Sequence, residues 1–122
     1  MPDTITIYHN PRCSKSRATL ELLQAEGHQP AVIEYLSTPP DAKTLGAILD
    51  LLGLEPRDLM RTHEQEYTAA GLDNPQLGRA ELIAAMIKYP RLIQRPIVVC
   101  GDQVALGRPP ENVLKILQGN SD

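Results

Sequence analysis

The fold of this chain is decided by one stretch near its start, Thr6–Arg17, which reads TIYHNPRCSKSR. The residues up to Tyr8 belong to a short alternating, β-prone run, and a tight loop containing Pro11 follows it. Cys13 then stands where a helix is expected to begin. A helix start presents unpaired backbone N–H groups and the positive end of the peptide dipole. It therefore favours a thiolate over a thiol and attracts anions.

Positive charge gathers around this cysteine, because Arg12, Lys15 and Arg17 are its near neighbours in the sequence. The plain alternative is a buried, inert cysteine that serves only packing. A loop position, a helix start and three cations are instead typical of a reactive thiolate. We therefore predict that Cys13 is a nucleophile that acts beside an anionic substrate.

The hydrophobic pattern along the chain predicts an α/β fold in one domain, 1–122. A strand, a helix and a strand open the chain and imply parallel pairing through a crossover. A helical insertion follows over about 41–89, and a hairpin and a helix close the chain. The predicted strands are 3–8, 31–36, 97–100 and 103–106, and the predicted helices are 14–26, one between Asp41 and Gly53, 55–61, 79–88 and 109–118.

Composition excludes several classes of function. The chain of 122 residues has a net charge of −3, four Tyr, no Phe and no Trp. A nucleic-acid binder needs general positive charge or stacking aromatics, so we expect no nucleic-acid partner. We find no apolar run of transmembrane length and no secretory signal, and we expect a cytoplasmic protein that has no membrane partner.

The two cysteines, Cys13 and Cys100, are too few for a secreted disulfide scaffold. No CxxC pair suggests zinc, and His28 and His63 lack partners at ligand spacing, so we expect no metal site. Cys100 ends a predicted strand, and we expect it to pack rather than react.

Two familiar cysteine loops are absent. A C-x5-R phosphatase loop needs an arginine six positions after the cysteine, but Thr19 stands there and the nearest arginine is Arg17. Cys13 and Ser16 form a C-x-x-S pattern, which lacks the second sulfur of C-x-x-C. The oxidised or modified form of Cys13 would therefore need an outside thiol for its reduction.

Three distant arginines are candidates for an anion site. Arg95 precedes Pro96 at the start of a predicted strand, where this element order commonly has a cis-proline that faces the nucleophilic loop. Arg108 follows the last predicted strand, and Arg61 ends a short helix. Each arginine read alone is as consistent with a solvated surface charge. Converging guanidiniums, however, would offer planar, forked donors to a tetrahedral oxyanion.

Two polar side chains flank the cysteine. His9 precedes the loop together with Asn10, and it either tunes the thiolate or simply packs. Ser16 lies one turn into the helix, where its hydroxyl either bonds the thiolate or is an ordinary helix-start serine.

With these residues in place, the chain resembles the glutaredoxin-coupled arsenate reductase family. The resemblance rests on the segment from Ile5 to Arg17, on Leu59-Met60-Arg61, on the run from Arg95 to Val99 and on Gly107-Arg108-Pro109. These segments come in the family's order and spacing over essentially the whole chain. The resemblance implies a thioredoxin-like fold with a helical insertion, in which a mixed four-stranded sheet follows the order β-α-β, helices, β-β-α.

The resemblance also implies a mechanism. The Cys13 thiolate attacks arsenate, glutathione forms an adduct with the arsenic, and glutaredoxin removes the glutathione so that arsenite leaves. No cofactor is bound, and glutathione is a co-substrate. The implied catalytic residues are Cys13, His9 and Ser16, the implied substrate-binding residues are Arg61, Arg95, Arg108, Asn10 and Arg17, and Pro96 is structural.

Two alternatives remain open at this stage. The C-x-x-S pattern also fits a monothiol oxidoreductase that acts on glutathione mixed disulfides. Related proteins of the same fold include regulators that bind RNA polymerase, and these commonly carry C-x-x-C in this loop. Ser16 argues against a disulfide-switched regulator but leaves a redox-silent one open.

Overall fold

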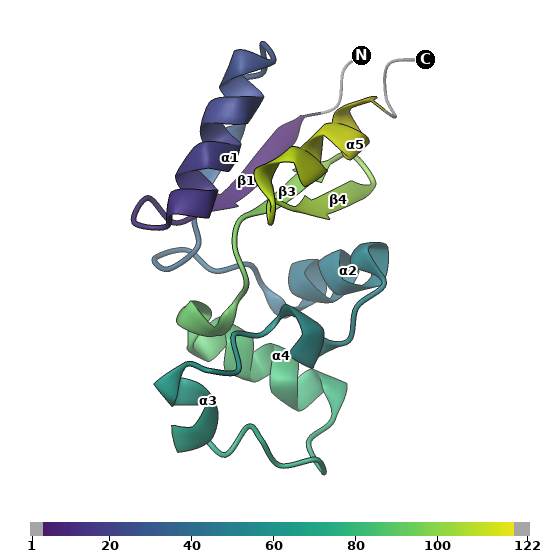
Figure 1. Ribbon diagram of the computed structural model, residues 1–122. Coiled ribbons are helices and arrows are strands. Elements are labelled where there is room, and N and C mark those ends of the chain that lie inside the picture. The colour runs from purple at the N-terminus through teal and green to yellow at the C-terminus, as the bar shows by residue number, and fades with distance from the viewer. Residues whose placement is uncertain (1–3, 119–122) are drawn as a thin grey trace. The chain divides into compact units, whose positions relative to one another are not determined.

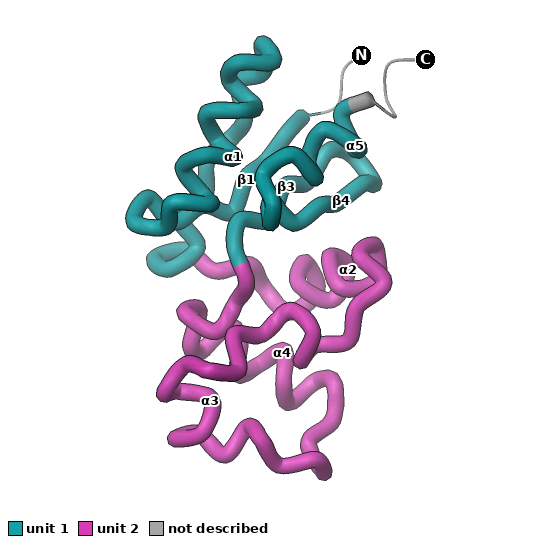
Figure 2. The backbone as a smooth tube through the Cα atoms, in the orientation of Figure 1, with its two compact units in different colours: residues 1–38, 95–122 teal, residues 39–94 magenta. Residues whose placement is uncertain are grey.

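A computed structural model describes residues 4–118, and the chain divides into two compact units (Figure 2). Unit 1 holds the residues up to Thr38 together with those from Arg95 onward, and unit 2 holds Pro39–Gln94. The predicted description as one domain with an insertion at about 41–89 stays a prediction.

A mixed four-stranded sheet forms the centre of unit 1 (Figure 1). Its strand order is β2-β1-β3-β4. β1 pairs in parallel with β2 and antiparallel with β3, and β3 and β4 form an antiparallel hairpin. The α/β class predicted from the sequence is therefore confirmed. The strands are β1 (Ile5–His9), β2 (Ala31–Glu34), β3 (Ile97–Cys100) and β4 (Gln103–Leu106).

Helices α1 (Ser14–Ala25) and α5 (Leu114–Gln118) cover one face of this sheet, and the 3-10 turn η3 (Pro110–Val113) leads into α5 (Figure 1). Alternate strand residues point into the core that they share, as the period of two requires. Burying these apolar side chains is the main source of stability in unit 1. The buried members of this core are Ile5, Ile7, Leu23, Val98, Cys100, Ala105, Val113 and Ile116.

Helix α1 begins and ends where local chemistry requires it. Cys13 is its N-cap in an extended conformation. At the other end, Gly27 takes a φ of 88°, and the N–H groups of Gly27 and His28 bond the carbonyls of Gln24 and Leu23. A left-handed residue favours glycine, so Gly27 closes the helix as predicted.

Unit 2 is helical, and α4 is in contact with α2, η1 and η2. Asp41 caps α2 by accepting a 2.8 Å bond from the N–H of Thr44, and Gly53 ends this helix with a φ of 70°. Both roles were predicted from the sequence. The elements are α2 (Ala42–Leu52), η1 (Pro56–Leu59), α3 (Gln65–Ala69), α4 (Arg79–Lys88) and η2 (Pro90–Leu92).

Three boundaries differ from the predictions. The second strand stops at Glu34 rather than at 36, because the Glu34 carbonyl accepts the N–H groups of Ser37 and Thr38 and turns the chain. The helix predicted over 55–61 is the shorter 3-10 turn η1. The closing helix begins as η3, with the N–H of Asn112 bonded to the carbonyl of Pro109. The predicted first strand starts at 3, which lies outside the described residues.

Within the described part of the chain, no helix is both long enough and apolar enough to cross a membrane.

Replacement of Leu23 by alanine tests the unit 1 core. The Leu23 side chain is 0% exposed, whereas that of Leu51 in α2 is 50% exposed. We expect Leu23→Ala to lower the free energy of unfolding by about 2–5 kcal/mol, because it removes buried methyl groups and leaves a cavity. We expect Leu51→Ala to change it by no more than about 0.5 kcal/mol. Urea unfolding measures both, and equal losses would contradict this core assignment.

Candidate active site around Cys13

A short loop carries the chain from the end of β1 to the cysteine at the start of α1. The N–H of Cys13 donates to the carbonyl of Asn10 at 3.0 Å, and the Cys13 carbonyl accepts from the N–H of Arg17 at 2.9 Å. This turn places the Cys13 side chain at the helix N-terminus, where it is partly exposed. A reagent or substrate can therefore reach the sulfur.

The pKa of Cys13 lies below its ordinary value. Burial alone would raise this pKa, since it disfavours the charged form. Four other influences lower it and prevail: the backbone N–H of Ser16, a hydrogen bond from Arg95, the charge of Arg95 and the backbone N–H of Lys15. The helix start and a nearby positive charge lower this pKa as expected, but the charge is that of Arg95 rather than of Arg12, Lys15 or Arg17, and the reactivity of Cys13 stays a prediction.

A buried polar network lies beneath the loop. Nδ1 of His9 and Oγ of Ser16 are 2.7 Å apart, and the same hydroxyl accepts the N–H of Asn10 at 3.0 Å. Oδ1 of Asn10 accepts the N–H of Arg12 at 3.0 Å. Ser16 thus lowers the pKa of Cys13 through its backbone N–H, while its hydroxyl holds the loop to β1.

His9 is held in its neutral form near pH 7. Its side chain is buried, and burial lowers its pKa below 6.5. The negative charge of Glu34 opposes this lowering, and the positive charge of Arg17 adds to it. A neutral imidazole both donates and accepts, which suits it to the hydroxyl of Ser16.

Arg95 approaches the sulfur from a different part of the chain. It precedes β3, the Arg95–Pro96 peptide bond is cis, and its guanidinium hydrogen-bonds Cys13. The predictions of a cis-proline here and of Arg95 near Cys13 are both confirmed. Nε of Arg95 is buried, and among the described residues it has no hydrogen-bond partner.

Arg108 lies beside Arg95. Its Nη1 donates to the carbonyl of Arg95 at 3.0 Å, and the side chain is exposed. Arg17, on α1, is also exposed and donates through Nη1 to the carbonyl of Pro11 at 2.8 Å. Both guanidiniums bond carbonyls, which leaves their charge uncompensated.

The cations around Cys13 share one further property. Among residues 4–118, none of them forms an ion pair with a carboxylate; every such pair lies in unit 2. Uncompensated positive charge at a partly exposed site favours the binding of an anion. The cations are Arg12, Lys15, Arg17, Arg95 and Arg108.

Arg61, the third predicted arginine, belongs to unit 2. Its Nη1 lies 2.7 Å from Oε1 of Glu64, and its Nη2 lies 3.3 Å from Nε2 of His63. Glu64 also pairs with Arg91 at 3.4 Å. Arg61 is therefore engaged within its own unit, and its role toward a substrate stays a prediction.

Cys100 lies in the unit 1 core at the other end of β1. It pairs with Ile5, whereas Cys13 follows the His9 end of the same strand. Four residues of strand span roughly 13 Å. A disulfide requires Cα atoms about 4.4–6.8 Å apart, so this fold excludes a bond between Cys13 and Cys100. Neither cysteine forms a disulfide within the described residues.

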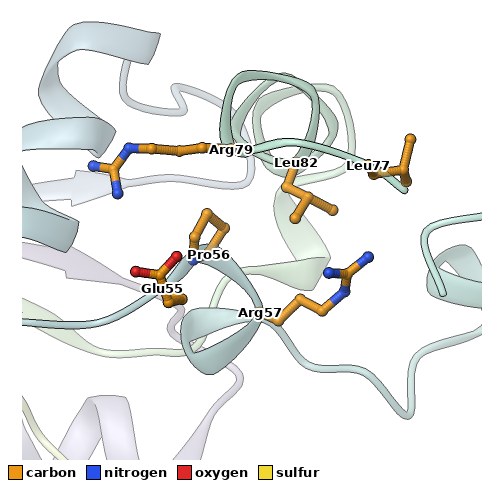
Figure 3. Close-up of a pocket in the computed structure, with 6 residues that line it drawn as sticks. All are labelled: Glu55, Pro56, Arg57, Leu77, Arg79 and Leu82. Atoms are coloured by element: carbon orange, nitrogen blue, oxygen red, sulfur yellow. The ribbon is translucent and has the colours of Figure 1, made fainter. Parts of the chain in front are cut away.

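A pocket of about 270 Å³ lies in unit 2 (Figure 3), and both of its arginines are already hydrogen-bonded to other residues of this unit. Arg57 donates to the Tyr67 hydroxyl and to the carbonyls of Leu72 and Asn74. Arg79 bonds the Gly46 carbonyl and Asp50. The pocket therefore resembles a structural junction more than a binding site. Its lining residues are Glu55, Pro56, Arg57, Leu77, Arg79 and Leu82.

Across residues 4–118, no group of three or more His, Cys, Asp or Glu side chains is placed to hold a metal ion.

Two residues that build this site carried no functional signal in the sequence. In the sequence, Thr19 marks only the position where a phosphatase arginine is absent, and Gly107 is only part of a Gly-Arg-Pro run. Both are buried, and they meet beside Pro96. The one sequence signal that points to this contact is that Gly107 directly precedes the candidate arginine Arg108.

Comparisons with known proteins agree on one family. The model of the ArsC family matches residues 8–116. The sequence is 48% identical over 118 residues to "Uncharacterized protein YfgD" of Escherichia coli, covering 96% of this chain and 99% of that one. It is 47% identical over 118 residues to "Arsenate reductase" of Neisseria meningitidis serogroup A, covering 96% and 100%.

A solved structure gives the same result. "Arsenate reductase from Vibrio cholerae" superposes with a TM-score of 0.90 at 49% sequence identity, covering 95% of this chain and 99% of that one.

Replacement of Arg95 by glutamine tests the origin of the low thiol pKa. We expect Arg95→Gln to move the midpoint of Cys13 alkylation upward by roughly one pH unit, because both a hydrogen bond and a charge are lost. Arg12→Gln is the matched control: it removes a neighbouring exposed cation that is not among the causes of the low pKa. Iodoacetamide rates measured against pH give both midpoints, with Cys13→Ser as the blank. Equal midpoints for Arg95→Gln and the unmodified protein would contradict the assignment.

Proposed function

The chain belongs to the ArsC family, and we propose that it is an arsenate reductase that uses Cys13 as its nucleophile. The observation that carries this proposal is the hydrogen bond from Arg95 to a partly exposed thiol of lowered pKa. A thiolate nucleophile and a guanidinium donor meet at one point. This arrangement suits attack on a tetrahedral oxyanion.

The first step is binding and attack. Arsenate enters among the cations of unit 1, with Arg95 and Arg108 as donors to its oxygens. The Cys13 sulfur forms a bond to arsenic, and one arsenate oxygen leaves as water after protonation. Arsenic stays pentavalent in this step. The helix N–H groups of Lys15 and Ser16 hold the sulfur as a thiolate until it attacks.

The second step requires electrons from outside the chain. Cys100 is kept from Cys13 by the sheet, so no internal disulfide supplies them. We propose glutathione and glutaredoxin as the reductants. Glutathione forms a second sulfur–arsenic bond as a second arsenate oxygen leaves as water, and a glutaredoxin thiolate then attacks the glutathione sulfur. The bonding electron pair returns to arsenic, which becomes trivalent, and water releases arsenite from Cys13.

This sequence balances. Two thiols become one mixed disulfide, arsenate loses one oxygen as water, and arsenic gains two electrons. The reaction proceeds without a bound cofactor. A cytoplasmic location, in which glutathione keeps thiols reduced, fits these reductants and is part of the proposal.

The remaining candidate residues have supporting roles. Arg108 completes the oxyanion contacts with Arg95, whereas Arg61 is paired with Glu64 within unit 2 and its role toward a substrate stays a prediction. Arg17 contributes charge. Asn10, His9 and Ser16 hold the loop in the shape that presents Cys13.

The test is arsenate-dependent NADPH oxidation in the presence of glutathione, glutaredoxin and glutathione reductase. We expect turnover that Cys13→Ser abolishes. Arg108→Gln should lower kcat/KM by roughly 100-fold, since it removes a donor to the oxyanion. Lys115→Gln, which removes an exposed cation of α5 that is not among those around Cys13, is the matched control and should remain within roughly threefold of the unmodified protein. Turnover no higher than that of Cys13→Ser would overturn the proposal.

A second candidate function rests on the isolation of Cys13 from Cys100. A lone accessible thiolate also suits a monothiol oxidoreductase that removes glutathione from mixed disulfides. A disulfide substrate needs no oxyanion donors, so this activity would survive Arg108→Gln. The test is the release of glutathione from a glutathionylated peptide. Equal rates for the unmodified protein and Arg108→Gln, together with no arsenate turnover, would select this candidate. The RNA-polymerase alternative stays a prediction.

A further inference from the structure

A close contact in unit 1 joins helix α1 to the two segments that carry Arg95 and Arg108. Gly107 directly follows β4 and is buried. A Cβ atom placed on it would collide with Oγ1 of Thr19 and lie 2.7 Å from Cγ of Pro96 and 3.0 Å from Cγ2 of Thr19. Gly107 does not take a positive φ. Glycine is therefore required here for space rather than for backbone conformation.

Thr19 is the helix side of this contact. Its side chain is 0% exposed, and its hydroxyl donates to the Lys15 carbonyl at 2.8 Å, with the Gly107 carbonyl at 3.4 Å. It stands six positions after Cys13 on the same helix. Any movement of Thr19 away from Gly107 therefore moves the helix that holds the thiolate.

The strand side of the contact holds both arginines. The N–H of Gly107 donates to the Pro96 carbonyl at 3.0 Å, and Arg108 donates to the Arg95 carbonyl at 3.0 Å. Arg95 and Pro96 are adjacent, as are Gly107 and Arg108. One packed junction thus determines how far the two guanidiniums stand from the start of α1.

We propose that Gly107 and Thr19 are positioning residues that set the distance between the Cys13 sulfur and the Arg95 and Arg108 guanidiniums. A C-x5-R loop carries its arginine and cysteine on one segment, six residues apart. In this chain Thr19 occupies the position that the arginine has in such a loop. Arg95 and Arg108 instead lie more than eighty residues after Cys13 in the sequence. A side-chain contact has to set their distance from the cysteine. The role toward an oxyanion rests on the proposed function, whereas the effect on the thiol does not.

A double-mutant cycle on the thiol pKa tests this. The four proteins are the unmodified chain, Gly107→Ala, Arg95→Gln and the double variant. We expect Gly107→Ala to raise the midpoint of Cys13 alkylation by roughly half a pH unit when Arg95 is present, because the added methyl moves the guanidinium from the sulfur. In the Arg95→Gln background we expect no further shift, since the effect acts through Arg95.

Gly46→Ala is the matched control. Gly46 lies in α2 of unit 2, and a Cβ there would meet nothing closer than 3.9 Å. We expect it to leave the alkylation midpoint unchanged. The double variant with Gly107→Ala and Thr19→Ala lacks two of the three atoms that crowd the added methyl. We expect its alkylation midpoint to lie closer to that of the unmodified protein than the midpoint of Gly107→Ala does.

Three results would overturn the proposal: a folded Gly107→Ala protein with an unchanged midpoint, an equal shift in the Arg95→Gln background, or an equal shift in Gly46→Ala. Should Gly107→Ala fail to fold, Thr19→Ala alone decides. We expect its midpoint to rise only when Arg95 is present, and an unchanged midpoint would overturn the proposal. None of these measurements uses arsenate, so their failure is distinct from a failure of the arsenate reductase assay.

Discussion

The structure of the site depends on one interaction, the hydrogen bond of Arg95 to the sulfur of Cys13 at the start of α1. Burial of the sulfur works against a thiolate, and the two helix N–H groups and the guanidinium work for it. The pKa of Cys13 stays lowered only while the start of α1 and the segment before β3 remain close together. The core between α1, α5 and the sheet keeps them close, because it packs both segments against the same strands.

The same constraint bears on the source of electrons in the proposed reaction. Cys13 is at the His9 end of β1, and Cys100 is opposite Ile5 at its other end. The sheet that places Arg95 beside the nucleophile also keeps the second sulfur away from it. In the proposed arsenate reduction, Cys100 therefore does not serve as the partner of Cys13, and the reducing equivalents are proposed to come from outside the chain.

Local sequence patterns predict much of unit 1, but they do not predict the contacts between residues far apart in the chain. The turn at Pro11, the helix start at Cys13 and the glycine at its end are short-range signals, and the position before Pro96 indicated that Arg95 lies near the thiol. The contact between Thr19 and Gly107 joins residues far apart in sequence, and a missing Cβ leaves no periodic signal. Nor does sequence show that Ser16 acts through its N–H while its hydroxyl binds His9.

Protection of Cys13 by substrate tests the central claim most directly. The rate of Cys13 alkylation at pH 7 is measured with increasing arsenate and, separately, with chloride at equal ionic strength. If the thiolate and the guanidiniums form one oxyanion site, arsenate slows alkylation to a saturating limit, chloride does not, and Arg95→Gln removes the protection. An alkylation rate that arsenate leaves unchanged in the unmodified protein would contradict the account.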